Sequence, residues 1–587
     1  MKASGEVLRE QLQFLDSSMN ESLPPSAERS AGLPAWLFAF LLSLLASVAL
    51  LAPFFWLGCA SGHDFEFHVA SWLDVAYQWK HGVIYPHWTS WTNYGFGEPR
   101  YVFYPPLSWM LGAALTVLLP VSWVPAAFIL FTQTLAGMSA FVLLRRFTAT
   151  RPACLGAAFY VANPYALLVS YIRSDFAEQL ACAFFPLFLL AALRLAGFLP
   201  GEKTKLSAVP PFAFAFATIW LCNAPAGVIV SYSMGLLFAW AAFSQKSWRI
   251  AARGAAGLAL GLGLTGFYLL PAAYEQRWVN IGQALSSGLL PADNFLFTRI
   301  SDVEHTWFNY ISSYCALFLI LLAAVTTLAS RRISSRETSN KNLWRTLLLL
   351  AAAASFLMLR LTLPLWNLLP KLRFVQFPWR WMSLLAVVAC CFFAAAIERR
   401  RGWLWFCLFV LLAVPLGVFL ARNTWWDPDE MPTQMAAIDS GTGFEGVDEY
   451  DPLGDDHLDL PKHAPLAAIL PASTEDSEAP APAAKIEEES WQPQDYRLRV
   501  ESPAPARVAL RLLNYPAWQV SVNGHTITPQ RPDDVNQMIV PVTAGASEIE
   551  VRFARTPDRT AGLALSAVSS LFVIGLWGCA KRQDLPS

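Results

Sequence analysis

Long apolar segments alternate with short polar loops over most of the chain. Apolar windows of about 20 residues, the helix length that crosses a hydrocarbon core of about 30 Å, recur between Pro34 and Leu420, and another lies near the C-terminus. This pattern predicts a polytopic α-helical membrane protein. The segment from Pro34 to Gly58 is long enough to remain as an anchor, and residues 1–33 before it predict a cytoplasmic disordered tail without a cleavable signal peptide.

Lysine and arginine gather in short loops between the apolar segments. The positive-inside rule places these loops in the cytoplasm. Two apolar segments separate successive clusters, which contain Arg145, Arg146 and Arg151, then Lys203 and Lys205, then Lys246, Arg249 and Arg253, then Arg331, Arg332, Arg336, Lys341 and Arg345, then Arg399, Arg400 and Arg401, and finally Lys581 and Arg582.

One apolar segment conflicts with this alternation. The segment from Pro105 to Leu119 has only about 15 residues, which is short for a full crossing. We therefore expect it to form a juxtamembrane or re-entrant helix. The transmembrane domain then covers residues 34–421 with about 12 spans, both termini in the cytoplasm, and residues 59–121 as an outer loop. The alternative topology has about 13 spans and an outside N-terminus.

The composition changes after the transmembrane domain. Residues 427–459 contain 11 acidic residues and no lysine or arginine, so we expect residues 422–494 to form an acidic, proline-rich extracytoplasmic connector. In residues 495–558, apolar and polar positions alternate and Asn523-Gly524 supplies a turn, which predicts a small extracytoplasmic β-sandwich. Residues 559–587 then give the last span and a cytoplasmic tail.

Composition supports the membrane assignment and excludes some functions. The 587 residues are 55% hydrophobic and 14% charged, which is more apolar surface than a soluble fold of this size buries. The net charge of -1 gives no argument for a nucleic-acid partner. Nearly all nine cysteines lie in apolar segments without metal-binding spacing, so they predict neither disulfides nor zinc ligands.

The first outer loop carries an unusual set of ionisable residues among aromatic ones. It contains His63, Asp64, Glu66, His68 and Arg100. Ionisable groups at a hydrocarbon boundary cost free energy unless they are paired, hydrated or bound to a cation, so they are functional candidates, Asp64 first. Carboxylates accept hydroxyl protons or hold a divalent cation, and aromatic faces stack on sugar rings. The alternative interpretation is an amphipathic interfacial helix with an aromatic belt.

A second cluster contains Arg173, Asp175 and Glu178. Arg173 and Asp175 either form a structural ion pair, or Asp175 faces the same cavity as Asp64, with Glu178 one helical turn further along the same face.

A third cluster, around Arg373 and Arg380, lies at the outer end of a later span. A bound phosphate would offset the cost of burying Arg380 through charge-assisted hydrogen bonds. Snorkelling of this side chain to the interface is the alternative. The outer loop from Tyr274 to Tyr310 adds further charged residues, including Glu275, Asp302, Glu304 and His305.

Several of these segments together resemble known membrane glycosyltransferases of the GT-C fold. More narrowly, they resemble a bacterial membrane protein family labelled 6-pyruvoyl-tetrahydropterin synthase-related, over about residues 35–450. The segments are His63-Asp64-Phe65-Glu66-Phe67-His68, Tyr94-Gly95-Phe96-Gly97, Tyr104-Pro105-Pro106, Ser174-Asp175-Phe176-Ala177-Glu178 and Phe377-Pro378-Trp379-Arg380. The label does not indicate a pterin activity, because the loop histidines lack the spacing of a zinc site.

The resemblance implies an enzyme of the bacterial inner membrane whose active site lies on the extracytoplasmic face. The donor would be a polyprenyl-phosphate sugar, and the acceptor a glycan, lipid or protein. Asp64 would be the base in an inverting displacement or a ligand of Mg or Mn. Asp175 would assist it in either role, and Arg380 would bind the phosphate. The resemblance also makes Glu66 a weaker catalytic candidate, and the predicted substrate-binding residues are His63, His68, Arg100, Tyr104, Arg173, Glu178, Arg373 and Arg380.

Two other functions remain open at this stage. A transporter or flippase of a lipid-linked or polar solute would also have many spans with buried charges, although these acids gather at one boundary rather than at the bilayer centre. A non-catalytic membrane scaffold is the third interpretation. Within the β-sandwich, Trp518 either binds acceptor glycan or belongs to a domain that only caps the bundle.

Overall fold

The computed structural model describes residues 34–199, 205–334, 341–398, 402–454, 460–472, 481–531 and 535–583. The chain divides into two units, Met1–Phe38 and Ala39–Ser587. Of the first unit, only residues 34–38 are described, and the arrangement below is that of the second. The predicted tail and the residues Lys203, Arg336 and Arg399–Arg401 of the predicted cytoplasmic clusters lie outside the described residues.

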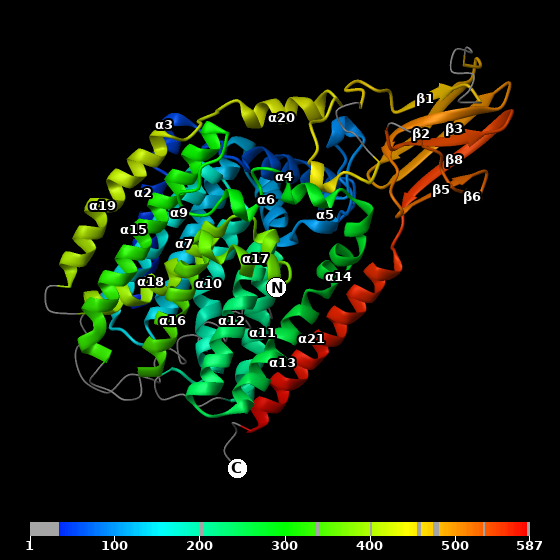
Figure 1. The fold of residues 1–587 in the computed structure, drawn as a ribbon. Helices are drawn as coiled ribbons and strands as arrows, with labels where there is room; N and C mark the ends of the chain where they lie inside the picture. The colour runs from blue at the N-terminus through cyan, green and yellow to red at the C-terminus, as the bar shows by residue number, and fades with distance from the viewer. Residues whose placement is uncertain are drawn as a thin grey trace. The chain divides into compact units, whose positions relative to one another are not determined.

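The helical part of the second unit is a bundle (Figure 1). In its first half the helices are α2 (Ala35–Leu50), α3 (Phe54–Leu57), α4 (Phe65–Lys80), α5 (Arg100–Phe103), α6 (Pro106–Leu118), α7 (Val124–Leu144), α8 (Thr150–Val161), α9 (Pro164–Leu168), α10 (Phe176–Leu195), α11 (Val209–Cys222) and α12 (Ala224–Ser244). In its second half they are α13 (Trp248–Leu264), α14 (Gly266–Glu275), α15 (Val303–Ser334), α16 (Lys341–Leu357), α17 (Leu363–Leu368), α18 (Met382–Ile397), α19 (Trp403–Arg422), α20 (Glu430–Asp439) and α21 (Pro557–Gln583).

Many of these helices are suited to a bilayer. Among the described residues, nine helical segments are long and apolar enough to cross a membrane, or eleven if each of two bent pairs forms one span. Pro106–Leu118, the segment that we excluded from the spans, is a shorter apolar helix. Leu206–Cys222 is another, and the predicted 12 spans require it to cross, so the exact number remains a prediction.

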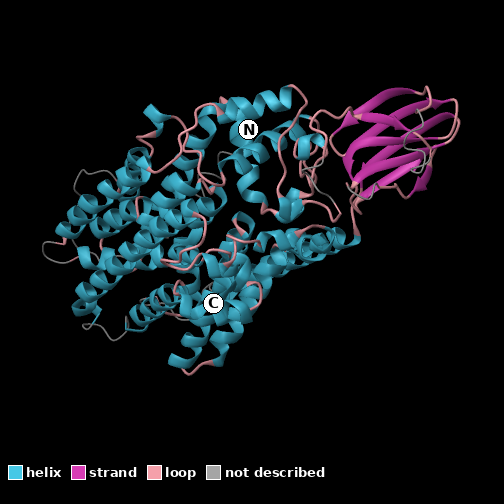
Figure 2. Cartoon of the chain, turned by 45° about the horizontal axis from the view of Figure 1, so that its top comes forward, coloured by secondary structure: helices cyan, strands magenta, loops and turns pink. Residues whose placement is uncertain are grey.

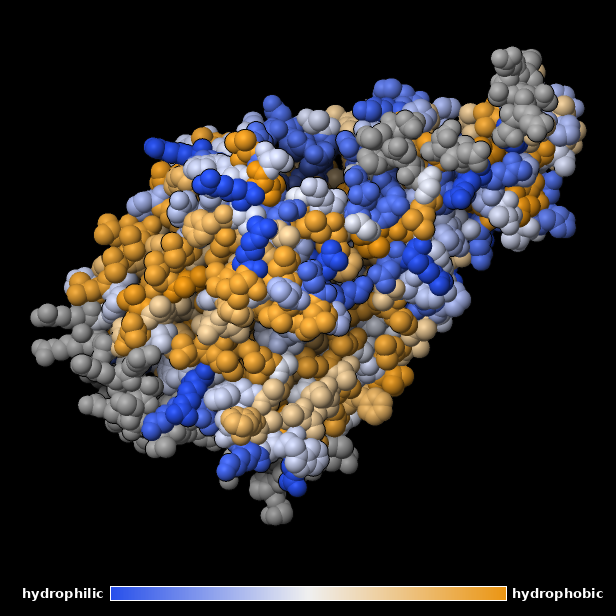
Figure 3. All heavy atoms as spheres, viewed as in Figure 1, coloured by the Kyte–Doolittle hydropathy of each residue, from blue (hydrophilic) through white to orange (hydrophobic). Residues whose placement is uncertain are grey.

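The surface of the bundle agrees with a lipid environment. In Figure 3, hydrophobic side chains cover the middle of the face shown, over α19, α15 and α16, while hydrophilic residues gather near α20. The large side chains exposed on α19 include Leu404, Leu408, Leu411 and Val414. Exposed apolar surface of this extent is stable only against lipid or another apolar partner, so the chain is a membrane protein with a helical transmembrane domain.

The strands form a separate domain before α21 (Figure 2). Its two antiparallel sheets have the orders β1-β4-β7 and β2-β3-β8-β5-β6. Apolar residues of both sheets, such as Leu510 and Val540 from one and Val500 and Val551 from the other, share one core. The strands are β1 (Ala467–Leu470), β2 (Lys485–Gln492), β3 (Asp495–Ser502), β4 (Ala506–Leu513), β5 (Trp518–Val522), β6 (His525–Ile527), β7 (Gln537–Val542) and β8 (Gly545–Phe553).

The β-structure begins earlier than the sequence pattern predicts. Strands β1 and β2 and helix α20 all lie within residues 422–494, which we expected to be an acidic, proline-rich connector. The physical reason is visible in β2, an edge strand whose Glu487, Glu488 and Glu489 are exposed. Charged side chains on an edge strand prevent it from pairing with other chains. Because a solvated linker is also rich in charged residues, composition does not distinguish the two.

The β-domain is attached to the bundle by buried polar contacts. Arg559 at the start of α21 donates to both carboxylate oxygens of Glu275 on α14 at 2.7 Å, and the Tyr515 hydroxyl donates to Glu275 at 2.6 Å. Trp518 is 6% exposed and packs against Trp88 and Phe553. Trp518 therefore belongs to the core of this contact, and the hypothesis that it binds acceptor glycan is corrected.

Candidate functional site

Two loops that are distant in sequence are joined backbone to backbone at the first candidate cluster. The amide of Asp64 donates to the Arg173 carbonyl at 2.9 Å, and the amide of Gly62 donates to Ser174 Oγ at 3.0 Å. A Cβ atom at Gly62 would lie 2.4 Å from the Ile172 carbonyl oxygen, so only glycine allows this approach. The contact places Asp64 beside the second cluster.

The second loop has a backbone that presents its side chains to the same place. The π-helical turn Val169–Arg173 ends at Ser174, which has a left-handed φ of 49°. Such a conformation is uncommon outside glycine, and π turns are often found at functional sites. Asp175 then caps α10, with its Oδ1 accepting from the Glu178 amide at 2.9 Å. The chain reverses here within a few residues, which directs Arg173 and Asp175 toward Asp64.

The carboxylates of this site are paired with guanidinium groups. Arg173 Nη2 donates to Asp64 Oδ2 and lies 3.7 Å from Asp175 Oδ2. The imidazole Nε2 of His68, a buried residue on α4, lies 3.6 Å from Asp175 Oδ1. Asp175 is 2% exposed, whereas the Asp64 side chain is 30% exposed, so of the two acids Asp64 is the one that a ligand in the adjoining cavity can reach.

Arg380 is buried and almost fully hydrogen-bonded. It is 5% exposed, its Nη2 donates to Asp175 at 3.2 Å, and its Nε donates to Glu178 at 3.1 Å. Its Nη1 donates to the Val375 carbonyl at 3.1 Å and to Gln376 Oε1 at 3.3 Å. The side chain therefore does not snorkel to the interface, and its charge is balanced by two carboxylates instead of being free for a phosphate.

Aromatic rings surround both guanidinium groups. Arg173 lies 5.0 Å from the Phe377 ring centroid and 5.5 Å from that of Trp379, and Arg380 lies 4.9 Å from Phe377. Phe377 and Trp379 stack on each other. Cation–π contacts lower the cost of desolvating a guanidinium, so the Phe377–Arg380 segment, one of the quoted motifs, serves to hold the two arginines in place.

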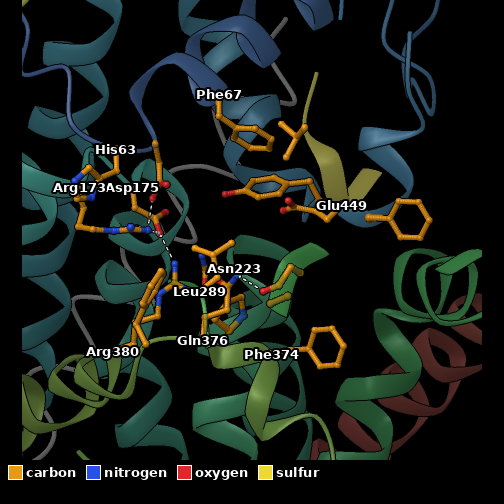
Figure 4. Close-up of a pocket in the computed structure, with 18 of the residues that line it drawn as sticks. His63, Phe67, Arg173, Asp175, Asn223, Leu289, Phe374, Gln376, Arg380 and Glu449 are labelled. Atoms are coloured by element: carbon orange, nitrogen blue, oxygen red, sulfur yellow. Dashed lines mark hydrogen bonds and ion pairs between the residues drawn. The ribbon is translucent and has the colours of Figure 1, made fainter. Parts of the chain in front are cut away.

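A cavity of about 1220 Å³ adjoins this cluster. Arg173, Asp175 and Arg380 lie at one end in Figure 4, and Glu449 lies across from them. Polar groups at the wall include Lys371, Gln276 and Asn223. Much of the remaining wall is apolar and comes from α11, α12, α14 and the loop after α14, with Trp220, Pro225, Val228, Leu269, Ala272, Ala273, Ile281 and Leu289. The cavity thus combines a charged end with an apolar wall.

The predicted site residues separate into three groups. The cavity wall contains His63, Asp64, Tyr104, Arg173, Asp175 and Arg380. His68 and Glu178 are buried behind it in contact with Asp175 and Arg380. The structure does not bring Glu66, Arg100 and Arg373 to the cavity. Glu66 and Arg373 are exposed elsewhere, and Arg100 is buried with its Nε donating to Glu98 at 2.6 Å.

Other residues of the cavity wall were missed. Asn223 caps α12 at the tight turn after α11, with its side chain accepting from the Ala226 amide at 2.9 Å. Glu449 and Tyr450 come from the acidic connector. Sequence signals existed for these residues. Asn223-Ala-Pro is typical of a helix start, and the glycines of the segment from Gly443, which contains Glu449 and Tyr450, indicate a constrained backbone.

The two aspartates differ in their electrostatic environment. Burial, together with the neighbouring Asp175, raises the pKa of Asp64 above its ordinary value despite the nearby Arg173. Burial alone would also raise the pKa of Asp175, but His68, Arg380 and Arg173 outweigh it and hold that pKa below its usual range. Asp175 therefore favours the ionised form, while Asp64 takes up a proton more readily.

The carboxylates of the site are held by hydrogen-bond donors rather than grouped around a common point. Within the described ranges, no group of three or more His, Cys, Asp or Glu side chains is placed to hold a metal ion. Asp64 Oδ2 accepts from Arg173, and Asp175 accepts from Arg380 and from the Glu178 amide. Guanidinium groups thus occupy oxygen positions that Mg or Mn would use, and binding of such a cation stays a prediction.

Comparison with known proteins identifies the family. Residues 101–426 match the family described as "6-pyruvoyl-tetrahydropterin synthase related domain; membrane protein", which covers more than half of the chain. The chain belongs to this family. The prediction made from the sequence segments is thus confirmed at the family level. The region matched in this 6-pyruvoyl-tetrahydropterin synthase related protein contains Tyr104, Arg173, Asp175 and Arg380, whereas Asp64 lies before it.

Comparison with curated proteins gives no match. Solved structures similar to this 6-pyruvoyl-tetrahydropterin synthase related protein include the apo Archaeoglobus fulgidus oligosaccharyltransferase, at 16% identity and a TM-score of 0.40 over 66% of this chain and 55% of the other. The oligosaccharyltransferase AglB of the same organism was solved in complex with an inhibitory peptide and a dolichol-phosphate. It is similar at 15% identity and a TM-score of 0.39, over 70% of this chain and 56% of the other. The matches span little more than half of those chains, and similarity at this level does not establish a shared activity.

Proposed function

We propose that this protein is a membrane glycosyltransferase that moves a sugar from a polyprenyl-phosphate donor to an acceptor on the extracytoplasmic face of the bacterial inner membrane. The observation that carries the proposal is the cavity, which joins the partly exposed Asp64 and the guanidinium of Arg173 to a long apolar wall. A lipid-linked donor needs both, an apolar surface for its isoprenoid chain and cations for its phosphate.

The phosphate is bound by Arg173 and Lys371 in this proposal. Arg380, the candidate from the sequence, is held by Asp175 and Glu178 and positions Asp175 instead. Lys371 Nζ makes one hydrogen bond, a donation to Gln276 at 3.1 Å, and lines the same cavity. An arriving phosphate competes with Asp64 for Arg173, because both are anions that bind a guanidinium in the same way.

The displacement of Asp64 from Arg173 prepares the chemical step. The freed carboxylate accepts the proton of the acceptor hydroxyl, and the acceptor oxygen forms its bond to the anomeric carbon. The bond from that carbon to the phosphate oxygen breaks, and the phosphate leaves with the electron pair, with inversion at carbon. Asp64 is suited to this role because burial raises its pKa, and a more basic carboxylate is a stronger general base.

A transfer assay tests this proposal. Full-length protein in reconstituted membranes is given radiolabelled sugar on extracted polyprenyl-phosphate donors with a cell-envelope extract as acceptor, and Asp64→Asn is compared with the wild type. We expect the variant to lose about 10²- to 10⁴-fold in rate, the typical contribution of a general base. Asp439→Asn is the matched control, because Asp439 is exposed on α20 and does not line the cavity.

Two outcomes contradict the proposal. Equal rates for Asp64→Asn and the wild type would exclude Asp64 as the base. No transfer from any donor by folded wild-type protein would favour a transporter or a scaffold instead.

A further inference from the structure

The acidic connector returns to the cavity as an ordered strap, residues 443–451. Its Phe444 amide donates to the Trp91 carbonyl at 2.9 Å, and its Val447 amide donates to Glu98 Oε2 at 3.0 Å. At the other end, Asp451 Oδ1 accepts from Asn93 Nδ2 at 2.9 Å. The strap is thus attached along its length to the first outer loop.

Two glycines allow the strap to lie this close. A Cβ atom at Gly443 would be 2.3 Å from the Trp91 carbonyl oxygen, and one at Gly446 would be 1.9 Å from Asn93 Oδ1. Because neither position accepts a side chain, the path of the strap is fixed, and so is the place where the following turn, Asp448–Tyr450, meets the cavity.

This turn brings the carboxylate of Glu449 to the cavity wall. Glu449 is half-buried and lines the cavity. Among the residues that the structure describes, no side chain is hydrogen-bonded or ion-paired to its carboxylate. In Figure 4 the carboxylate lies across the cavity from Arg173 and Asp175. The carboxylate has a backbone hydrogen bond to its own residue, and its remaining acceptor positions are open to hydrogen bonds from a ligand.

Aromatic rings stand beside this carboxylate. Phe67, Tyr104 and Tyr450 all line the cavity. The ring centroids of Phe67 and Tyr104 are 4.7 Å apart, and those of Phe67 and Tyr450 are 6.4 Å apart. Tyr450 also stacks on Phe103, with an interplanar angle of 2°. The rings form an apolar wall that extends from Tyr450, next to Glu449, to Tyr104, whose ring centroid is 5.8 Å from that of His68.

We propose that Glu449 and the rings of Phe67, Tyr104 and Tyr450 form a carbohydrate subsite that selects an uncharged sugar. The rings pack against a sugar face, and the carboxylate accepts hydrogen bonds from adjacent hydroxyl groups. The sugar is either that of the donor or the first residue of the acceptor. This inference rests on the proposed function only in expecting a sugar beside Asp64.

The charge distribution gives the selectivity. Arg173 and Arg380 lie across the cavity from Glu449 (Figure 4), so a phosphate is drawn to them. Glu449, whose pKa burial raises to about 7, repels a phosphate when it is ionised. A sugar that carries its own carboxylate would meet the same repulsion at the subsite and would leave Glu449 without a hydrogen-bond donor. We therefore expect uronic acids to be excluded.

Binding is measured without transfer, on the full chain in lipid nanodiscs by saturation-transfer NMR. The probes are methyl glycosides of glucose, galactose, mannose and N-acetylglucosamine, and methyl glucuronide. We expect the wild type to bind at least one neutral glycoside and not the glucuronide. Glu449→Gln should lower the affinity for the neutral glycoside about tenfold or more, the effect of replacing a charged acceptor by a neutral one. The same variant should bind the glucuronide.

Glu445→Gln is the matched control, because Glu445 is on the same strap, exposed and outside the cavity wall. Extracted polyprenyl-phosphate hexose, titrated separately, assigns the source of the sugar. A loss of affinity for this lipid in Glu449→Gln identifies the donor sugar, and a loss for free glycosides alone identifies the acceptor.

Three results would overturn the subsite, namely equal affinities for Glu449→Gln and the wild type, no binding of any neutral glycoside, or equal binding of the glucuronide by the wild type. Binding that depends on Glu449 in a protein without transfer activity would contradict the proposed function and leave the subsite standing.

Discussion

The two buried arginines of the cavity, Arg380 and Arg173, have different roles. Arg380 faces Asp175 and Glu178 at 3.2 and 3.1 Å and has few donors left, whereas Arg173 pairs with a carboxylate that is itself partly exposed. A guanidinium with two buried anions is a structural group, because removing it leaves both anions unpaired. One that shares a partly exposed anion can exchange it for a ligand.

Replacement of Arg380 should therefore destabilise the protein more than replacement of an exposed arginine does. For Arg380→Gln we expect a loss of about 3–5 kcal/mol, the usual cost of breaking a buried ion pair from one side, measured by thermal unfolding in nanodiscs. Arg373→Gln, on the same loop but exposed, should stay within about 0.5 kcal/mol of the wild type. Equal melting temperatures for the two variants would contradict the structural role of Arg380.

The pH dependence of transfer should report on Asp64. A base must be deprotonated, so the rate falls as pH decreases through the pKa of Asp64, which burial raises above the ordinary 3.8. Because the charge of Arg173 lowers this pKa, Arg173→Gln should move the midpoint to higher pH in rate–pH profiles. Arg422→Gln removes an exposed charge outside the cavity wall and should not move it. A midpoint that moves down in Arg173→Gln would contradict this assignment.

Among the secondary-structure elements, the contact of the two loops before α4 and α10 determines whether the site exists. The amides of His63 and Asp64 donate to the carbonyls of Ile172 and Arg173, so the spacing of the two segments does not depend on the rotamers of Asp64 or Asp175. This is a rigid way to hold two ionisable groups together.

A methyl group at Gly62 should open this contact. Gly62→Ala would place Cβ 2.4 Å from the Ile172 carbonyl oxygen, and we expect a loss of about 1–3 kcal/mol from the overpacking together with a loss of transfer. Gly282→Ala is the control, since nothing lies within 4 Å of its added Cβ. Thermal unfolding and the transfer assay check both variants. An unchanged Gly62→Ala would show that the loops are not held at this distance.

The sequence predicts the helices and strands better than it predicts which of their side chains come into contact. The apolar windows locate most spans, and Pro106–Leu118 is the short helix that its length indicates. The joining of Asp64, Asp175 and Arg380 was only one of several interpretations, because burial and pairing depend on tertiary packing. Glu66 shows the limit, since it is two residues from Asp64 and yet exposed away from the cavity. Side chains two positions apart on a helix point to different sides, and the composition of the loop does not specify which side faces the cavity.

Over the whole molecule, the β-domain and the bundle share buried contacts at Glu275. This carboxylate is fully buried and accepts from Arg559 and Tyr515. The domain boundary that sequence composition predicts is therefore less sharp in the folded chain, where both the strap and the β-domain contact the bundle. Alternating strands were predictable, but this attachment was not, because each partner alone is an ordinary charged residue.

Replacement of Glu275 should loosen the β-domain. For Glu275→Gln we expect a loss of about 3–5 kcal/mol, because Arg559 is left buried without an anion. Tyr515→Phe removes one hydrogen bond to the same carboxylate and should cost about 1.5–3 kcal/mol. Hydrogen exchange of strands β4 and β5 measures the effect. Protection that is as high in Glu275→Gln as in the wild type would show that the domain is held by other contacts.

The pairing of Glu275 with Arg559 can form only late in synthesis. The two residues are 284 positions apart, so a ribosome completes α14 and inserts it long before α21 emerges. Until then the nascent chain carries an unneutralised carboxylate at the membrane boundary, which is costly to bury. Chains that stop before α21 should therefore retain Glu275 without its arginine partner.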